Sequence, residues 1–231
     1  MNCVLLLCML QSASLFIESY SRHFTRLVLI YCLCEKPIIR DKNLTICFDL
    51  GWAESMNAKE ISKLASQLAR VHGANKKSKS PAKIYFSNFS KTSLLYQECV
   101  RKHIGFESFP IELCAEPHYD LFDKSEIVIL SPDAEKPLES TELGKVYVIG
   151  GIVDETRKKQ LTLDQAEANQ VAARRLPIRE HLERDTSKKG ACTILAANQV
   201  FEILLKEYET RDWVEALRVG VPPRKGFKLC N

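Results

Sequence analysis

The chain lacks the short motifs that mark several large enzyme classes. It has no GxGxxG dinucleotide fingerprint, no GxxxxGK[ST] phosphate loop, no GxSxG nucleophile elbow and no HExxH zinc motif. Its 5 histidines are dispersed, so no local pattern supports a cysteine and histidine nucleophilic pair. These absences argue against a Rossmann-type dehydrogenase, a P-loop NTPase, an α/β-hydrolase and a zincin metalloprotease.

Paired cysteines and long apolar runs are also missing. The 9 cysteines are odd in number, scattered and without CxxC pairs, which argues against a zinc site or a disulfide framework and favours a reducing compartment. The early apolar runs, Cys3 to Ile17 and Leu27 to Leu33, fall short of the roughly 18 to 20 residues that span a bilayer, and the basic start of a signal peptide is absent. We therefore expect residues 1–40 to be an atypical apolar leader or the result of an alternative start, with no membrane partner.

The remaining composition is that of an ordinary globular protein. A chain of 231 residues with 45% hydrophobic and 27% charged residues is long enough for one full core. The net charge of +4 is small, but lysines and arginines cluster in several short stretches. Such clusters favour a polyanionic partner at one face, whereas a solvated loop is the better explanation of any single cluster.

The first half alternates strand and helix patterns. Residues 44–50 alternate apolar and polar side chains and predict a strand, and Asn57 with Glu60 has the spacing of a capping box. The following helix is expected to end near His72 and Gly73, with a polar basic loop over residues 75–81. A strand over residues 84–86, a helix over 93–102 and a short strand near Ile111 complete this half.

The second half continues the same rhythm. We expect strands over residues 126–130 and 146–149, with a turn at 131–133 that opens a short helix. Thr162 and Gln165 predict the start of a helix that runs to about Ala173, followed by an extended piece over residues 175–178 because Pro177 disfavours helix before it. Helices from about Asn198, and from Asp212 to Gly220, end the chain. Strands separated by helices predict an α/β fold with a mainly parallel sheet.

The stretch KVYVIGGIVDE, residues 145–155, is the best candidate for a ligand site. An uncharged, β-branched strand ends there in Gly150 and Gly151, which permit positive φ and close approach of a ligand, and Asp154 follows. A plain turn with a solvated aspartate explains these residues about as well. Three other loops fall at strand ends or before a helix: residues 130–131, 176–177 and 194–198. Such loops can bind adenine or ribose through backbone groups, so composition alone does not identify the ligand.

Several longer stretches closely resemble one family. They are VYVIGGIVDE, RRLPI, ILAANQVFEILLKEYETRDWVEAL and PPRKG, with EISKLASQLARVHGANKKSKSP and LLYQECVRKHIGFESF in the first half. From about Asn43 to Leu229 the chain resembles the tRNA position-nine methyltransferases of the SPOUT superfamily, most of all the vertebrate B paralogue. The resemblance implies an α/β fold with a C-terminal trefoil knot, S-adenosyl-L-methionine as cofactor, and methylation of N1 of the purine at tRNA position nine.

The resemblance also implies roles for individual residues. Asp154 would be the catalytic base that accepts the N1 proton of guanine. The cofactor would be held, mostly through backbone groups, by Leu130, Gly150, Gly151, Glu155, Thr156, Arg157, Lys158, Lys159, Leu163, Pro177, Ile194, Leu195 and Ala196. The family usually has a basic extension before this domain, where this chain has the apolar leader.

The basic residues are expected to divide into a tRNA-facing set and solvated bystanders. The candidates for contact with tRNA are Lys76, Lys77, Lys79, Arg157, Lys158, Arg174, Arg179 and Arg224. Each phosphate contact would add to the salt dependence of tRNA binding.

Taken together, the sequence predicts a SPOUT methyltransferase domain over residues 41–231 that methylates N1 of guanine at tRNA position nine. Methylation of adenine N1 and a catalytically weak tRNA-binding protein that keeps the cofactor pocket remain open alternatives. We expect a monomer with no resident metal and no obligate protein partner, in the cytoplasm, the nucleus or both.

Overall fold

A computed structural model describes residues 43–153, 161–187 and 190–229 of the chain. Its framework is a six-stranded sheet in which every pairing is parallel, in the order β3-β2-β1-β5-β4-β6. The strands are β1 (Thr45–Asp49), β2 (Lys83–Ser87), β3 (Glu112–Leu113), β4 (Ile127–Leu130), β5 (Val146–Gly150) and β6 (Ala172–Arg174). The predicted α/β fold with a mainly parallel sheet is confirmed.

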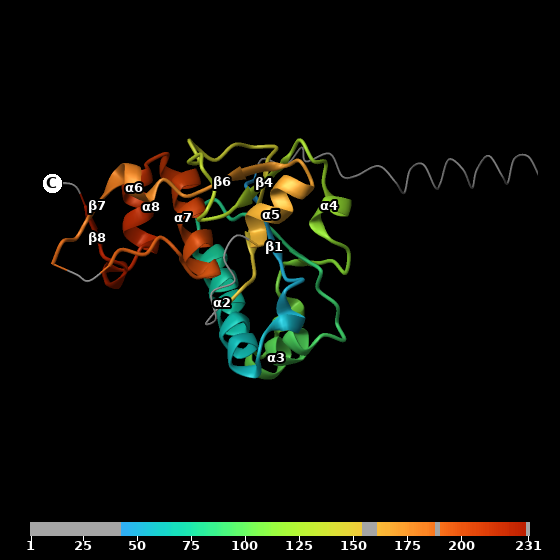
Figure 1. Cartoon of the computed structure of the whole chain (residues 1–231). Helices are drawn as coiled ribbons and strands as arrows, with labels where there is room; N and C mark the ends of the chain where they lie inside the picture. Colours follow the sequence, from blue (N-terminus) through green and yellow to red (C-terminus); the bar gives the residue numbers. More distant parts are fainter. Residues whose placement is uncertain (1–42, 154–160, 188–189, 230–231) are drawn as a thin grey trace, which may run out of the picture. The chain divides into compact units, whose positions relative to one another are not determined.

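Helices cover both faces of this sheet (Figure 1). The α-helices are α2 (Ala58–Lys77), α3 (Leu94–Lys102), α4 (His118–Leu121), α5 (Leu161–Ala168), α6 (Ile178–His181), α7 (Ala197–Thr210) and α8 (Trp213–Gly220). Single 3-10 turns lie at η1 (Ala53–Ser55), η2 (Phe106–Ser108) and η3 (Pro223–Lys225). A separate antiparallel pair, β7 (Leu182–Arg184) with β8 (Phe227–Leu229), was not predicted.

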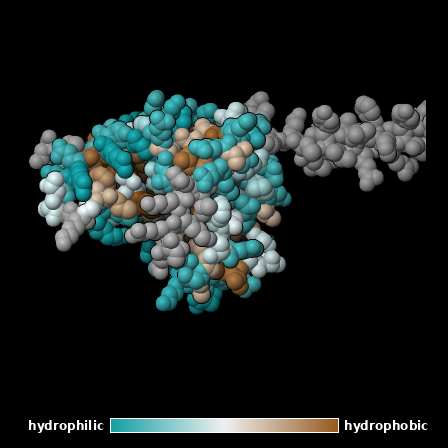
Figure 2. All heavy atoms as spheres, viewed as in Figure 1, coloured by the Kyte–Doolittle hydropathy of each residue, from teal (hydrophilic) through white to brown (hydrophobic). Residues whose placement is uncertain are grey.

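Alternation along the strands divides the core into two clusters. Ile46, Phe48 and Ile149 pack in the larger cluster with residues of α2, α3, α7 and α8. Cys47 and Val148 point the other way and pack with Phe122 and with Ala166 of α5. All five residues of β1 are buried, as expected for a central strand covered on both faces. On the outside, the visible face is mostly hydrophilic with scattered hydrophobic patches (Figure 2).

Helix α2 begins where the sequence predicts but ends later. The capping box is present, because Asn57 Oδ1 accepts from the Glu60 N–H at 3.1 Å and Glu60 Oε2 accepts from the Asn57 N–H at 2.9 Å. The expected end at His72 and Gly73 is wrong, since the helix continues to Lys77. Its last turn is anchored by the buried Asn75 amide, which donates to the Ala82 carbonyl at 2.9 Å and accepts from the Ala82 N–H at 2.7 Å.

Two elements of the second half also differ from expectation. The helix α5 ends at Ala168, and Ala173 lies instead in β6, because that segment finds backbone partners on β4. Thr162 lies inside the first helical turn rather than at its cap. The turn at residues 131–133 is present, but no helix follows it; the chain there extends beside Arg175, whose N–H donates to the Lys136 carbonyl at 3.0 Å. The extended piece stops before Ile178, which starts α6.

A buried polar network ties the β4 to β5 connection to the C-terminal helices. Glu207, 1% exposed, accepts from the Thr141 N–H at 3.0 Å and from its hydroxyl at 2.5 Å. Arg211 donates to the Thr141 carbonyl, and Trp213 Nε1 donates to the Glu139 carbonyl at 2.7 Å. These contacts fix α7 and α8 against residues 139–141. A trefoil knot in this region stays a prediction.

Candidate functional site

The carboxyl ends of the strands bring several predicted residues to one edge of the sheet. Leu130 ends β4 and pairs with Ile149 on one side and Arg174 on the other, while Asp49 ends β1 opposite Gly150. The strand order reverses between β1 and β5, because β2 and β3 extend to one side and β4 and β6 to the other. In open α/β sheets ligands bind beyond the carboxyl ends of the strands at such a reversal.

The glycine turn after β5 is tied to the neighbouring strand. The Gly151 N–H donates to the Asp49 carbonyl at 2.8 Å. Positive φ, which the sequence led us to expect as a use for these glycines, occurs at neither Gly150 nor Gly151. They are required by space: a Cβ on Gly151 would lie 2.4 Å from Leu50 Cδ2, and one on Gly150 would lie 2.9 Å from Thr162 Cγ2.

The backbone beyond the turn leads toward the predicted base. The Val153 N–H has the Met56 sulfur as its acceptor at 3.5 Å, and a thioether is only a weak acceptor. Asp154 lies outside the described residues, as do the predicted cofactor-binding residues Glu155, Thr156, Arg157, Lys158 and Lys159. Their predicted roles are therefore untested by the geometry.

The remaining predicted cofactor-binding residues are apolar and lie in three further segments. Leu163 is half-buried on α5, and Pro177 is buried immediately before α6. Ile194 is 55% exposed, and Leu195 and Ala196 are half-buried in the segment that enters α7. Val153, Leu176 and Leu195 all pack against the larger core cluster. Three loops that are far apart in sequence therefore contact the same part of the core.

The segment before α7 is held by side chains from other elements. The Ala196 N–H donates to Gln199 Oε1 at 2.9 Å, and the Ala197 N–H donates to Gln67 Oε1 of α2 at 3.0 Å. Lys225 Nζ donates to the Ile194 carbonyl. The apolar side chains of this segment suit an uncharged adenine ring better than a polyphosphate, which needs basic or glycine-rich loops.

A buried carboxylate that was not among the predicted site residues lies at the same edge. Asp49, 2% exposed, accepts through Oδ1 from the Asn88 amide at 2.7 Å and from the Gly51 N–H at 3.1 Å. Asn88 has a positive φ of 54°, so its backbone is fitted to this contact. The signal available in the sequence was an acidic residue at the carboxyl end of a mostly apolar strand, a position at which parallel sheets place binding groups.

His118 of α4 completes this buried group. Its Nδ1 lies 3.9 Å from Asp49 Oδ2, and the residue is 1% exposed. Neither ring nitrogen has a hydrogen-bond partner among the described residues. Burial lowers the pKa of His118, while the Asp49 charge opposes that change.

The predicted tRNA-facing cations among the described residues lie on several different elements. Lys76 and Lys77 occupy the last turn of α2 rather than a loop, and Lys79 follows it; all three are exposed. Arg174 ends β6 and donates to the Ala173 carbonyl at 2.8 Å, while Arg179 and Arg224 are exposed on α6 and η3. No cluster of three or more metal-ligating side chains occurs in residues 43–153, 161–187 and 190–229, and no helix there is long and apolar enough to cross a bilayer.

The fold and the site define a class. The sheet is parallel, and loops with apolar side chains lie where its strand order reverses. This is the framework of a nucleotide- or nucleoside-binding protein. The family model described as tRNA (guanine(9)-N(1))-methyltransferase TRM10/TRM10A matches residues 33–226. The chain belongs to this family, which confirms the resemblance found in the sequence.

Individual relatives agree with the family match. The chain is 45% identical to the rat "tRNA methyltransferase 10 homolog B" over 187 residues, covering 80% of this chain and 59% of the rat protein. It is 42% identical to the zebrafish (Danio rerio) protein of the same name, covering 83% of this chain and 62% of that protein. The chain therefore spans about three fifths of the length of these relatives.

A solved structure agrees in fold. A crystal structure of full-length spTrm10 in complex with SAH aligns with a TM-score of 0.68 at 29% identity, covering 79% of this chain and 99% of that one. The SPOUT-type architecture predicted from the resemblance is confirmed by this match.

Proposed function

We propose that this protein transfers a methyl group from S-adenosyl-L-methionine to N1 of guanine at position nine of tRNA. The observation that carries the proposal is the family match over residues 33–226, which includes the glycine turn at the end of β5. The relatives' names supply the substrate: one from Eremothecium gossypii, 30% identical, is a tRNA (guanine(9)-N1)-methyltransferase.

The cofactor is proposed to lie over the carboxyl edge of β4 and β5. Bound there, S-adenosyl-L-methionine supplies an electrophilic methyl group on a sulfonium. Leu130, Gly150 and Gly151 would hold it from the strand ends, and Leu163, Pro177 and the segment Ile194–Ala196 would enclose its apolar parts. SAH is bound in the spTrm10 complex, which supports the same class of cofactor for this chain. The proposed cofactor-binding residues also include Glu155, Thr156, Arg157, Lys158 and Lys159.

Asp154 is proposed to act as the base. Guanine N1 carries a proton at neutral pH, so the nitrogen attacks the methyl carbon well only if that proton leaves. As the N1–C bond forms and the C–S bond breaks, the proton passes to the Asp154 carboxylate and the sulfur leaves as a neutral thioether. A carboxylate in hydrogen-bond reach of N1 prevents positive charge from building up on the guanine ring. Adenine N1 has a free lone pair, so Asp154 would contribute less to its methylation.

The domain bounds, the oligomeric state, the compartment and the tRNA contacts are also proposals. The catalytic domain would comprise residues 41–231 and work as a monomer in the cytoplasm, the nucleus or both, with residues 1–40 outside it. Transfer RNA would be contacted by Arg157 and Lys158 next to the catalytic aspartate, by the exposed Lys76, Lys77 and Lys79, and by the half-buried Arg174 together with the exposed Arg179 and Arg224.

The test uses tRNA transcripts that differ only at position nine. Labelled methyl should appear with guanine at that position, and Asp154→Asn should lower the rate by about 10²-fold or more while the affinity for S-adenosyl-L-methionine stays the same. Transfer to adenine with little effect of Asp154→Asn would favour the adenine alternative. Binding of tRNA without transfer to either purine would favour the catalytically weak protein.

A further inference from the structure

The segment that leads into α7 contains three proposed cofactor-binding residues but has little support of its own. Residues 191–196 belong to no helix or strand. Ala191 and Cys192 are exposed and Ile194 is 55% exposed, so burial does not fix the first half of the segment. A stretch with few buried contacts opens easily unless hydrogen bonds from other elements hold it. The conformation of this segment therefore depends on the elements around it.

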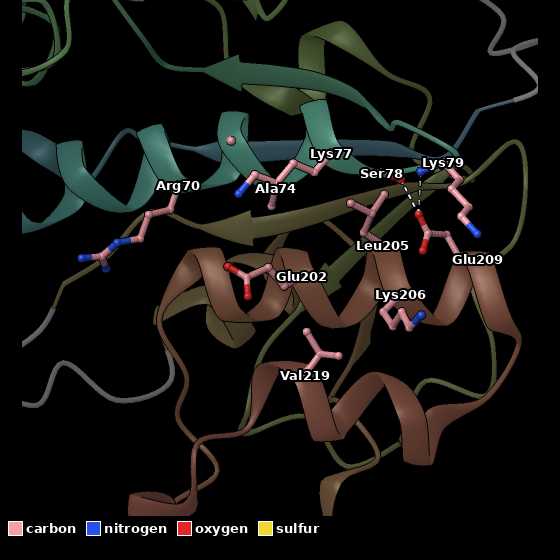
Figure 3. A pocket seen from close by; sticks show the side chains of 11 residues that line it. Arg70, Ala74, Lys77, Ser78, Lys79, Glu202, Leu205, Lys206, Glu209 and Val219 are labelled. Carbon is pink, nitrogen blue, oxygen red and sulfur yellow. Dashed lines mark hydrogen bonds between the residues drawn. The ribbon is translucent and has the colours of Figure 1, made fainter.

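Helix α7, which follows the segment, is fixed against α2 at both of its ends. At its start, the Ala197 N–H donates to Gln67 Oε1 of α2 at 3.0 Å. At its other end, Glu209 accepts hydrogen bonds from the Ser78 hydroxyl and from the Lys79 N–H, directly after α2 (Figure 3). The helix therefore gives the segment a fixed end point at Ala197, and the part that precedes it needs a second anchor.

The second anchor is Lys225, the last residue of η3. The Cys192 N–H donates to the Lys225 carbonyl at 3.0 Å, and the Lys225 ammonium group donates to the Ile194 carbonyl. One residue thus contacts the segment twice, on both sides of Thr193. Lys225 is half-buried and has no carboxylate partner among the described residues, so its charge acts on the backbone of the segment rather than in an ion pair.

The turn that contains Lys225 is itself rigidly placed. Gly226, the next residue, has a φ of 76°, and a Cβ there would lie 2.5 Å from the Gly190 carbonyl oxygen. The Gly226 carbonyl accepts from the Asp185 N–H at 2.9 Å. Directly beyond it, β8 pairs with β7. The Lys225 side chain therefore extends from a fixed backbone to the segment before α7.

The two anchors leave the middle of the segment available to a ligand. Leu195 lies between them, one residue after Ile194 and two residues before Ala197. Neither the N–H nor the carbonyl of Leu195 has a hydrogen-bond partner among the described residues. The edge of an adenine ring has both hydrogen-bond donors and acceptors, so it can pair with such backbone groups. The anchored segment thus presents unpaired backbone groups at a defined place.

We propose that Lys225 is a positioning residue for the cofactor, an inference that rests on the proposed function. Its ammonium group holds the Ile194 carbonyl and so keeps the backbone of Leu195 and Ala196 in the conformation that binds S-adenosyl-L-methionine. Lys225 acts through Ile194 and makes no contact with the reacting atoms. Without this hydrogen bond the segment adopts the binding conformation for only part of the time, and the apparent affinity falls by that fraction.

Lys225→Met tests the contact, because methionine has a side chain of similar length but no donor. Calorimetry should find that the dissociation constant for S-adenosyl-L-methionine rises about 10-fold, as expected if the binding conformation is populated for about a tenth of the time. Lys225→Arg keeps a cationic donor and should restore the affinity to within about threefold of the wild type. Lys228→Met is the matched control, since it removes the same charge from an exposed site on β8 and should leave the affinity unchanged.

Kinetics separate this role from one in the chemical step. With the tRNA transcript as substrate, Lys225→Met should raise the KM for S-adenosyl-L-methionine about 10-fold and leave kcat within about twofold of the wild type. A fall in kcat with unchanged KM would overturn the proposal and assign Lys225 to the chemical step. A wild-type dissociation constant in Lys225→Met would also overturn it, as would equal losses of affinity in Lys225→Met and in either Lys225→Arg or Lys228→Met.

Hydrogen exchange tests the anchor without cofactor or activity. The amides of residues 191–197 should exchange faster in Lys225→Met, while those of β1 and β5 exchange at the wild-type rate, because loss of the anchor loosens the segment and not the core. Unchanged exchange over residues 191–197 would overturn the anchor. Failure of the wild type to bind S-adenosyl-L-methionine would refute the proposed function instead, and the exchange comparison would still decide whether Lys225 holds the segment.

Discussion

Replacing Gly151 by alanine should destabilise the protein and damage the proposed cofactor site together. The new Cβ would lie 2.4 Å from Leu50 Cδ2 and 3.0 Å from the Asp49 carbonyl oxygen, whereas carbon atoms in contact normally lie about 3.5 to 4.0 Å apart. One of the two partners must therefore move by about 1 Å. Leu50 is 1% exposed and has little room, so part of the displacement should fall on the turn.

The size of the effect follows from these contacts. Forcing an extra methyl into a packed core costs about 1 to 3 kcal/mol. If the turn moves instead, the hydrogen bond from the Gly151 N–H to the Asp49 carbonyl, 2.8 Å long, is weakened, and such a bond contributes about 0.5 to 1.5 kcal/mol. We expect the free energy of unfolding to fall by about 1 to 3 kcal/mol. Because a shift of about 1 Å can cost 10²-fold in rate, methyl transfer should fall by about that factor.

Urea unfolding measures the stability, and calorimetry measures binding of S-adenosyl-L-methionine. Gly73→Ala is the matched control: its Cβ meets nothing, so it should raise the free energy of unfolding by about 0.4 to 1 kcal/mol. Leu50→Val removes the atom in the clash, so the double variant with Gly151→Ala should be less destabilised than the sum of the two single changes. Wild-type stability and cofactor affinity in Gly151→Ala would refute the account of this turn.

Three further predictions concern the framework. Asn57→Ala should lower the free energy of unfolding by about 0.5 to 2 kcal/mol, because the capping box of α2 is lost; urea unfolding with Asn57→Ser as a near-neutral control measures it. Thr141→Val should cost about 1.5 to 3 kcal/mol, since the buried Glu207 carboxylate loses a donor, and an unchanged urea midpoint would contradict this. Burial lowers the pKa of His118 below 6.5, so below about that pH the unfolded chain binds a proton that the folded chain resists. Stability should therefore fall as the pH drops from 7 to 5, and His118→Asn should make that dependence flatter; equal slopes would mean that His118 is not its source.

The sequence predicted the elements whose signals are local. The strand at residues 44–50, the capping box at Asn57 and the helix that starts after Asp212 all follow from side-chain periodicity and capping. The end of α2 was wrong because Asn75 finds its partners on Ala82, in a segment that local patterns do not connect to the helix. Ala173 likewise lies in a strand because of a neighbour more than forty residues earlier in the chain, and helical spacing contains no information about such pairing.

The site was predictable to a similar degree. The glycine turn was found from its motif, but the reason for its glycines, the close approach of Leu50, depends on β1 and β5 lying side by side. Asp49 and His118 were missed because they are far apart in the chain and meet only where α4 packs against the end of β1. Family resemblance supplied the proposed activity and the proposed base, neither of which the composition indicated.

The pairing of β1 with β5 also affects how the chain can fold. Thr45 pairs with Val146. During synthesis, one edge of β1 therefore has no partner strand until about a hundred more residues have been made. At roughly 5 to 20 residues per second, a ribosome needs on the order of 5 to 20 s to supply it. During that time β1, buried along its whole length in the finished protein, has β2 on one side and an open edge on the other. Open, apolar edges recruit other strands, so the newly made first half should depend on chaperones until residue 150 has left the ribosome.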